Sequence, residues 1–197
     1  PRQGKSTVEP GGDGEQSIPV IAAARDNGIR LNLRMRKATY MFSKQGAQAI
    51  EDWGRPIVKA IGDAPEVVGY DMGDERPLTE LYDIVAGIAK FKQLDPSRPS
   101  MLTFWDPASV RAYGPYVPLN VTDVYPLDST GKNAAYMYDW CKKVARDSNN
   151  QRQWIILQSF GAAPWKPHTG YQAPTPEQLR LMTWASLAGG ARGLIYF

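Results

Sequence analysis

The 197-residue sequence has a single cysteine, Cys141, and a single histidine, His168. These two shortages exclude an internal disulfide framework and a zinc site built from several His or Cys ligands. No apolar run approaches 18 residues, so we expect no membrane-spanning helix. Lys and Arg total 23 against 20 Asp and Glu. Because these charges are scattered without a basic cluster, we expect no nucleic-acid partner. Hydrophobic residues make up 43% of the chain, which is typical of a globular domain with a packed core.

The two ends of the chain differ in character. Residues 1–16 are polar and rich in Gly and charge, so we expect an N-terminal segment or loop there. The chain starts at Pro1 without a signal-like segment and ends inside an apolar run, residues 193–197. We therefore expect a fragment whose residues 17–197 form one partial domain. Its partner would be the remainder of the parent chain.

Hydrophobic periodicity predicts strands that alternate with helices. The predicted strands cover residues 31–36, 67–72, 101–105, 121–125, 154–158 and 194–196. The predicted helices cover residues 17–28, 50–61 with a kink at Pro56, 81–88, 134–146 and, after a capping box at residues 175–178, 176–188. This alternation favours a parallel sheet, either doubly wound or closed into a barrel. No GxGxxG or GxxxxGK turn follows a strand, so the main sign of a nucleotide-binding sheet is missing.

Polar residues inside the first two predicted strands are the first functional candidates. Leu33 and Met35 share an apolar face, which leaves Arg34 and Arg36 on the opposite face. Asp71 lies inside the second strand, where Arg34 could neutralise it because a buried carboxylate needs a partner.

Glu75 lies where the second predicted strand ends and a loop begins. Barrel enzymes build their active sites at this carboxyl end of the strands. The alternative is a structural charge at the start of the helix that follows, which the helix dipole would favour. Both interpretations stay open from the residues alone.

Aromatic and hydrogen-bonding side chains follow the later predicted strands. Asp123 and Tyr125 lie on the same face of their predicted strand. Gln158 also lies on the face of its strand that we expect to point inward. The tryptophans at helical positions, Trp53, Trp140 and Trp184, are expected in the core.

Several short motifs resemble one family in the right order. Residues 69–77, Gly-Tyr-Asp-Met-Gly-Asp-Glu-Arg-Pro, resemble the fourth strand of clan A glycoside hydrolases, the (β/α)8 retaining glycosidases. That family carries Asn-Glu-Pro there, so Arg76 is an intervening residue in this chain. Further resemblances lie at residues 95–99, 123–126, 154–161 and 184–196, which match the turn before strand five, strand six, strand seven, and the last helix with strand eight.

The resemblance covers about residues 17–197. It implies an α/β fold of the (β/α)8 TIM-barrel type, incomplete, with about six β/α units corresponding to strands three to eight. It also implies a glycosidase that cleaves a poly- or oligosaccharide, with Glu75 as general acid/base, no cofactor and no metal. In such an enzyme aromatic faces would pack on the C–H groups of the sugar and polar groups would bind its hydroxyls. The predicted substrate-binding residues are Arg36, Asp71, Trp105, Asp106, Tyr125, Gln158 and Trp165. An extracellular or periplasmic location follows from the resemblance alone.

One departure from the family concerns the nucleophile. Clan A enzymes end strand seven with a Glu, whereas this chain offers Gln158, which cannot form a glycosyl ester. The second carboxylate, as nucleophile or as the base of an inverting enzyme, would then come from elsewhere. Asp123 is favoured, with Asp74, Asp106 and Asp128 as the others. The alternatives are a non-catalytic carbohydrate-binding barrel and a metal-assisted hydrolase that uses Asp71, Asp74 and Glu75.

Overall fold

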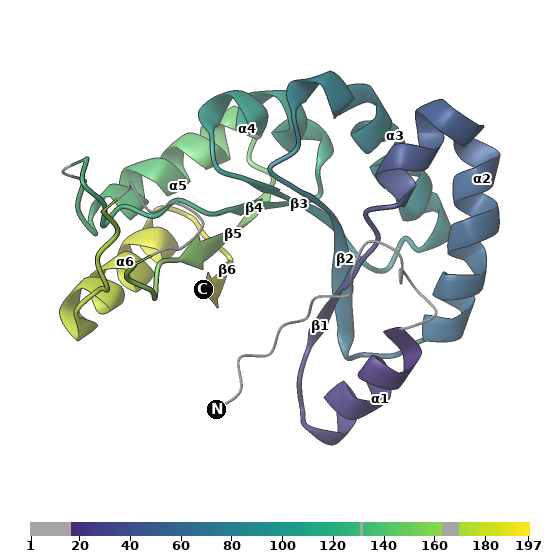
Figure 1. The fold of residues 1–197 in the computed structure, drawn as a ribbon, viewed down its shortest axis with the longest axis horizontal. Coiled ribbons are helices and arrows are strands. Elements are labelled where there is room, and N and C mark those ends of the chain that lie inside the picture. Colours follow the sequence, from purple (N-terminus) through teal and green to yellow (C-terminus); the bar gives the residue numbers. More distant parts are fainter. Residues whose placement is uncertain (1–16, 131, 163–169) are drawn as a thin grey trace. The chain divides into compact units, whose positions relative to one another are not determined.

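The computed structural model describes residues 17–130, 132–162 and 170–197 (Figure 1). The predicted segment at residues 1–16 and the candidate Trp165 lie outside the described residues. The chain forms two compact units, one up to residue 102 and the other from residue 103. In the described part of the chain, no helix is both long and apolar enough to cross a membrane.

Strands and helices alternate along both units, as the sequence predicts. The first unit contains α1 (Ser17–Asp26), β1 (Leu31–Arg34), α2 (Ala38–Ile61), β2 (Val67–Asp74), the short 3₁₀ helix η1 (Leu78–Glu80), α3 (Leu81–Leu94) and the start of β3 (Ser100–Phe104). The second unit contains the end of β3, then α4 (Pro107–Tyr113), the short 3₁₀ helix η2 (Gly114–Tyr116), β4 (Leu119–Thr122), α5 (Tyr136–Asp147), β5 (Arg152–Leu157), α6 (Pro176–Ala188) and β6 (Gly193–Tyr196).

The strands follow one another in the sheet in chain order, from β1 to β6. The pairs β1/β2, β4/β5 and β5/β6 are parallel. This α/β arrangement, in which parallel strands follow in sequence and a helix returns the chain each time, is that of part of a (β/α)8 barrel.

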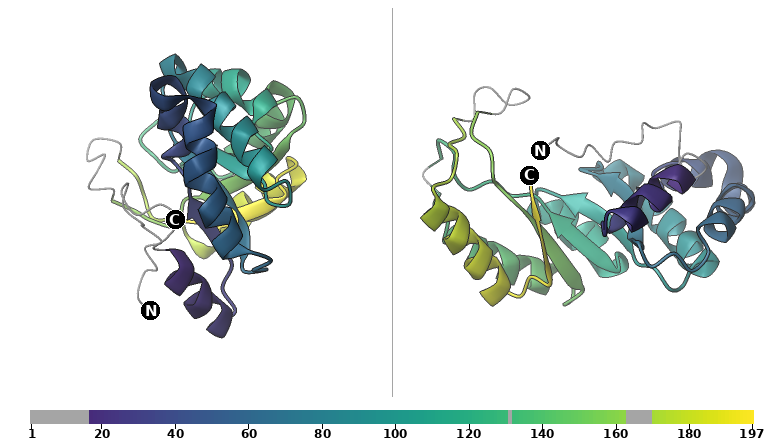
Figure 2. Two further views of the ribbon diagram at one scale, coloured as in Figure 1. Left: turned by 90° about the vertical axis from the view of Figure 1, so that its right-hand side faces the viewer. Right: turned by 90° about the horizontal axis from the view of Figure 1, so that it is seen from below.

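In the first unit, α2 and α3 pack closely side by side (Figures 1 and 2). Gly54 permits this approach, because a Cβ there would lie 2.8 Å from Leu94 Cδ1. The buried core between the helices and β2 consists of Ile50, Ile57, Tyr70, Met72, Ile84, Ile88 and Phe91. The kink expected at Pro56 is instead at Gly46, whose φ of 81° and ψ of 175° interrupt the helix. Glycine adopts this conformation readily because it has no Cβ.

In the second unit, α5 and α6 pack against each other (Figures 1 and 2). The predicted capping box is confirmed, because Thr175 Oγ1 accepts from Gln178 N and Gln178 Oε1 accepts from Thr175 N. Trp140 is buried as predicted, but the same prediction for Trp184 was wrong, since its side chain is 64% exposed. Helix periodicity places a residue on a face of α6 without saying which face is covered.

The loop between α3 and β3 is built on one buried carboxylate. Asp95 accepts hydrogen bonds from Tyr70 Oη at 2.6 Å, Ser97 N at 3.0 Å and Arg98 Nη1 at 2.7 Å. Arg98 also donates to Val67 O at 3.0 Å, which ties the loop to the start of β2. Burial disfavours the charged form of Asp95, but the hydrogen bonds from Ser97, Tyr70 and Arg98 outweigh it and lower the pKa of this carboxyl to about 2.

We expect Asp95→Asn to lower the free energy of unfolding by about 3 kcal/mol at pH 7, because Arg98 would lose its buried counter-ion. The pKa of Asp95 is depressed in the folded state. The stabilisation is therefore present above about pH 4 and lost as the pH falls toward about 2. Urea unfolding at pH 7 and near pH 2.5 measures both effects.

The matched control is Asp63→Asn, which changes an exposed carboxylate in the loop between α2 and β2. This variant should unfold like the wild type at both pH values. Equal stability of Asp95→Asn and the wild type at pH 7 would contradict the role assigned to Asp95.

Candidate functional site

Charged side chains gather where β1 and β2 end. The two strands are parallel, with Arg34 in register with Asp71, so their carboxyl ends meet at one edge. Arg36 donates to Asp71 Oδ2 from Nε at 3.1 Å and from Nη2 at 2.8 Å. Arg34 Nε lies 3.9 Å from the same oxygen. The predicted Arg34–Asp71 pair is therefore a long contact, and Arg36 is the main partner of Asp71. We call Arg36, Asp71, Asp74 and Glu75 the β2-end cluster.

Two of the three carboxylates in this cluster share the Arg36 guanidinium. Asp71 Oδ1 also accepts from Gly73 N at 3.0 Å. Burial raises the pKa of the Asp71 carboxyl above its usual range, although Arg36 favours the ionised form. Asp74, whose side chain is half exposed, has its Oδ2 3.8 Å from Arg36 Nη2. These contacts assign Asp71 and Asp74 a part in holding the strand ends together.

Glu75 differs from both aspartates. It is exposed, and within residues 17–130, 132–162 and 170–197 its side chain makes no hydrogen bond or ion pair. Its φ is 47°, in the left-handed region that L-residues avoid. Among the described non-glycine residues, only Asn149 and Asn150 share a positive φ, and Asn tolerates this conformation well. Such strain persists only where the surroundings enforce it, and it concentrates at functional sites.

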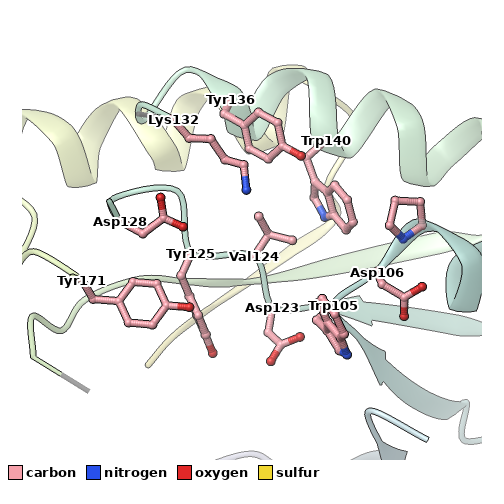
Figure 3. Close-up of a pocket in the computed structure, with 11 residues that line it drawn as sticks. Trp105, Asp106, Asp123, Val124, Tyr125, Asp128, Lys132, Tyr136, Trp140 and Tyr171 are labelled. Atoms are coloured by element: carbon pink, nitrogen blue, oxygen red, sulfur yellow. The ribbon is translucent and has the colours of Figure 1, made fainter. Parts of the chain in front are cut away.

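The second unit has a pocket of about 340 Å³ beyond the carboxyl ends of β3 and β4 (Figure 3). Trp105 follows β3 and Asp123 follows β4, and Asp123 N donates to Phe104 O at 3.1 Å. We call this the aromatic pocket. Its aromatic lining residues are Trp105, Tyr125, Tyr136, Trp140 and Tyr171, and its charged lining residues are Asp106, Asp123, Asp128 and Lys132.

The pocket combines flat rings with charged tips. Figure 3 shows the Lys132 ammonium group pointing into the pocket, where it lies 5.2 Å from the Tyr136 ring centroid. Trp140 Nε1 donates to Thr122 Oγ1 at 3.0 Å, which fixes the indole ring in the wall. Aromatic faces can pack on the C–H face of a sugar while charged groups bind its hydroxyls. The pocket is therefore chemically suited to carbohydrate.

Two aspartates that line the pocket also accept hydrogen bonds from nearby backbone N–H groups. Asp106 is the N-cap of α4, and its Oδ1 accepts from Ala108 N at 2.8 Å and Ser109 N at 2.9 Å. Burial disfavours the charge on Asp106, but the bonds from Ser109 and Ala108 outweigh it and lower the pKa of the carboxyl. Asp128 Oδ1 accepts from Thr130 N at 2.8 Å. Both carboxylates thus stabilise local backbone turns.

Sequence reasoning missed part of this pocket. It did not single out Lys132, in the loop before α5, or Tyr136, which lies inside the helix predicted at residues 134–146. It assigned Trp140 to the core, and this residue is both buried and part of the pocket lining. Helix α4 was also missed, although Asp106 followed by Pro107 is a recognisable helix start.

Gln158, which follows β5, connects the loops beside the pocket. It is fully buried, and its Oε1 accepts from Leu127 N at 3.0 Å. Its Nε2 lies within hydrogen-bond distance of Leu127 O, Gln172 O and Phe160 O, at 3.2, 3.0 and 3.3 Å. Both ends of the amide are therefore engaged with the backbone. Its predicted contact with substrate stays a prediction.

The metal-assisted alternative finds no ligand set here. In the described part of the chain, no three Asp, Glu, His or Cys side chains come together as a metal site requires. Asp71 and Asp74 both face Arg36, which competes for their oxygens.

Comparison with known proteins bears on the fold and on part of the sequence. No protein-family model matches the chain. A stretch of 90 residues is 36% identical to the beta-galactosidase BgaA of a Thermus species, covering 41% of this chain and 13% of that protein. The chain is glycoside hydrolase-like. It spans only about an eighth of the length of the curated relatives it matches.

Solved structures of glycoside hydrolases share the α/β fold described above. The GH53 catalytic domain of Ignisphaera aggregans matches with a TM-score of 0.65 and 10% identity, over 92% of this chain and 66% of that one. The GH2 beta-galacturonidase of Eisenbergiella tayi, bound to galacturonate, matches with a TM-score of 0.62 and 13% identity, over 90% of this chain and 34% of that one. At these identities the likeness concerns the fold.

The contacts of Gln158 predict that Gln158→Glu does not supply a nucleophile and destabilises the protein by about 2–4 kcal/mol at pH 7. The new carboxylate would face Leu127 O, Gln172 O and Phe160 O with no N–H to donate. Burial beside these oxygens raises the pKa of the introduced Glu, so the loss should shrink as the pH falls. Urea unfolding at pH 7 and pH 5 measures it.

The matched control is Gln172→Glu, which makes the same substitution on an exposed side chain nearby. This control should change the unfolding free energy by less than about 0.5 kcal/mol. Equal losses in the two variants would show that the amide of Gln158 does not tie the loops.

Proposed function

We propose that this chain belongs to the catalytic part of a glycosidase that cleaves a poly- or oligosaccharide, with Glu75 as general acid/base. The main support for this proposal is the difference in partners among the three carboxylates at the end of β2. Asp71 and Asp74 are occupied by Arg36, whereas the Glu75 side chain is exposed on a strained backbone and has no partner among the residues that the structure describes. The stretch similar to a beta-galactosidase and the shared fold support the same reaction class. They also make β-galactosides the first substrates to test.

In this proposal Glu75 donates a proton to the leaving oxygen of the glycosidic bond. Its free carboxyl can approach that oxygen, because no side-chain partner has to be displaced first. A second, ionised carboxylate must act on the opposite face of the sugar ring. We propose Asp123 for that role, because it follows β4 directly and lines the aromatic pocket. Asp74 is the other candidate, but its contact with Arg36 counts against it.

The aromatic pocket would bind the sugar rings. Trp105 and Tyr125 supply flat faces, and Asp106 supplies a hydrogen-bond acceptor at the rim. Arg36, held by Asp71, would donate to hydroxyl groups at the end of β2. Trp165, which lies outside the described residues, stays a predicted substrate-binding residue.

One observation favours a second candidate, a carbohydrate-binding barrel without catalysis. Gln158 stands where the resembled family carries its nucleophile, and its amide is committed to backbone groups. In that case the protein would bind glycans, with quenching of Trp105 fluorescence as a signal, and no turnover would appear with any of them.

We expect Glu75→Gln to lower kcat/KM by about 10² to 10⁴ for a β-galactoside with a sugar leaving group, such as lactose. The loss should be much smaller for 4-nitrophenyl β-galactoside, because nitrophenolate leaves without a proton. This difference between leaving groups identifies a lost general acid. Reducing-sugar release and nitrophenol absorbance measure the two rates.

Asp74→Asn is the matched control, since it removes the neighbouring exposed carboxylate. It should change both rates by less than about tenfold and leave their ratio intact. Asp123→Asn, in contrast, should lower both rates strongly, because the second carboxylate acts with either leaving group. Undiminished lactose hydrolysis by Glu75→Gln would overturn the assignment of the acid. Glycan binding without any turnover by the wild type would favour the second candidate.

A further inference from the structure

Arg76, the residue after Glu75, contacts three elements of the first unit. Arg76 Nε donates to Glu80 Oε2 at 2.8 Å, and Arg76 Nη2 reaches the same oxygen. The guanidinium carbon lies 4.7 Å from the ring centroid of Tyr40 on α2. The aliphatic part of the side chain packs on Gly73 of β2, where a Cβ would lie 2.9 Å from Arg76 Cγ. Arg76 thus joins β2, α2 and η1 at one point.

We propose that Arg76 is a positioning residue for Glu75, and that its pairing with Glu80 and Tyr40 keeps its charge away from the Glu75 carboxyl. This inference rests on the proposed function of Glu75. The Glu75 side chain has no partner in the described residues that would orient it, so its direction follows from its own backbone. That backbone is left-handed, and a left-handed Glu needs its neighbours to hold it.

The anchoring lies directly beside the strained residue. Glu75 separates the last residue of β2 from Arg76, so a fixed Arg76 leaves the chain little freedom at Glu75. The contact with Gly73 fixes the chain before the strained position, and the contacts with Glu80 and Tyr40 fix it after.

The charge of Arg76 matters as much as its position. A guanidinium next to a carboxyl favours the ionised form, which is the wrong form for an acid that must deliver a proton. Glu80 neutralises Arg76, and the Tyr40 ring attracts the same cation. The other charged groups at the ends of β1 and β2 pair among themselves. Among the described residues they are Arg34, Arg36, Asp71 and Asp74. Lys37, just beyond Arg36, lies over the Trp53 ring, with its Nζ 5.6 Å from the ring centroid.

The first test replaces Arg76 in the full-length protein, with lactose and 4-nitrophenyl β-galactoside as probes. Arg76→Met keeps the aliphatic packing and removes the anchors. We expect kcat for lactose to fall by about ten- to a hundredfold with KM within about twofold, and nitrophenyl hydrolysis to fall far less. Arg76→Lys retains the charge over Tyr40 but lacks the planar fork, so its kcat should be intermediate.

The second test separates charge from position through pH. Glu80→Gln keeps a hydrogen-bond acceptor but removes the negative charge that holds Arg76. We expect the alkaline limb of the kcat/KM profile for lactose to move to lower pH, because the Arg76 charge then acts on Glu75. The double variant Arg76→Met/Glu80→Gln should lack this movement. A ¹³C carboxyl titration of Glu75, assigned with Glu75→Gln, measures the same movement without substrate.

The outcomes are distinct. Arg76→Met could lose kcat equally with both substrates, in proportion to the fall in its urea unfolding midpoint, and Arg76→Lys could fail to restore it. That result would show that Arg76 has only a structural role and would overturn the inference. Wild-type kcat in Arg76→Met, or an unmoved alkaline limb and titration in Glu80→Gln, would also overturn it. Full lactose hydrolysis by Glu75→Gln, or no turnover by the wild type, would instead overturn the proposed function and the inference with it.

Discussion

The Arg36 guanidinium donates two hydrogen bonds to Asp71 and lies near Asp74, and this sharing organises the carboxyl end of β2. A buried carboxylate without a partner would be costly, and Arg36, from the chain just beyond β1, supplies that partner. The neighbouring backbone bond from Met35 N to Asp71 O, at 2.8 Å, holds the same two segments together. Arg36 is shared by the two aspartates, so in the described part of the chain Glu75 is the acidic residue at this strand end whose carboxyl has no partner.

Much of the fold follows from local pattern. The alternation that puts Leu33 and Met35 in the core and leaves Arg34 and Arg36 for Asp71 is visible in four residues. Other features depend on contacts that no local pattern reveals. Pro56 looked like the break in its helix, yet Gly46 provides it through a backbone conformation that glycine adopts readily.

Some features of the candidate site can likewise be predicted from local sequence, and others cannot. A carboxylate at the end of a strand, such as Glu75, is readable from strand parity and a short motif. Its left-handed backbone is not, since φ at one Glu depends on how the following loop is anchored. Gln158 shows the same limit, because its partners Leu127 and Gln172 are 31 and 14 residues away in the chain. The resemblance predicts that Gln158 stands where the family carries a Glu, and only the structure shows that the Gln158 amide ties two loops.

Asp106 caps α4 and lines the aromatic pocket at the same time. A change of specificity through this residue would therefore remove the N-cap of a seven-residue helix, and such a loss costs about 1 kcal/mol. Lys132 has an exposed side chain and, among the described contacts, caps no helix. We therefore expect a substitution at Lys132 to change the pocket lining with less loss of stability than a substitution at Asp106.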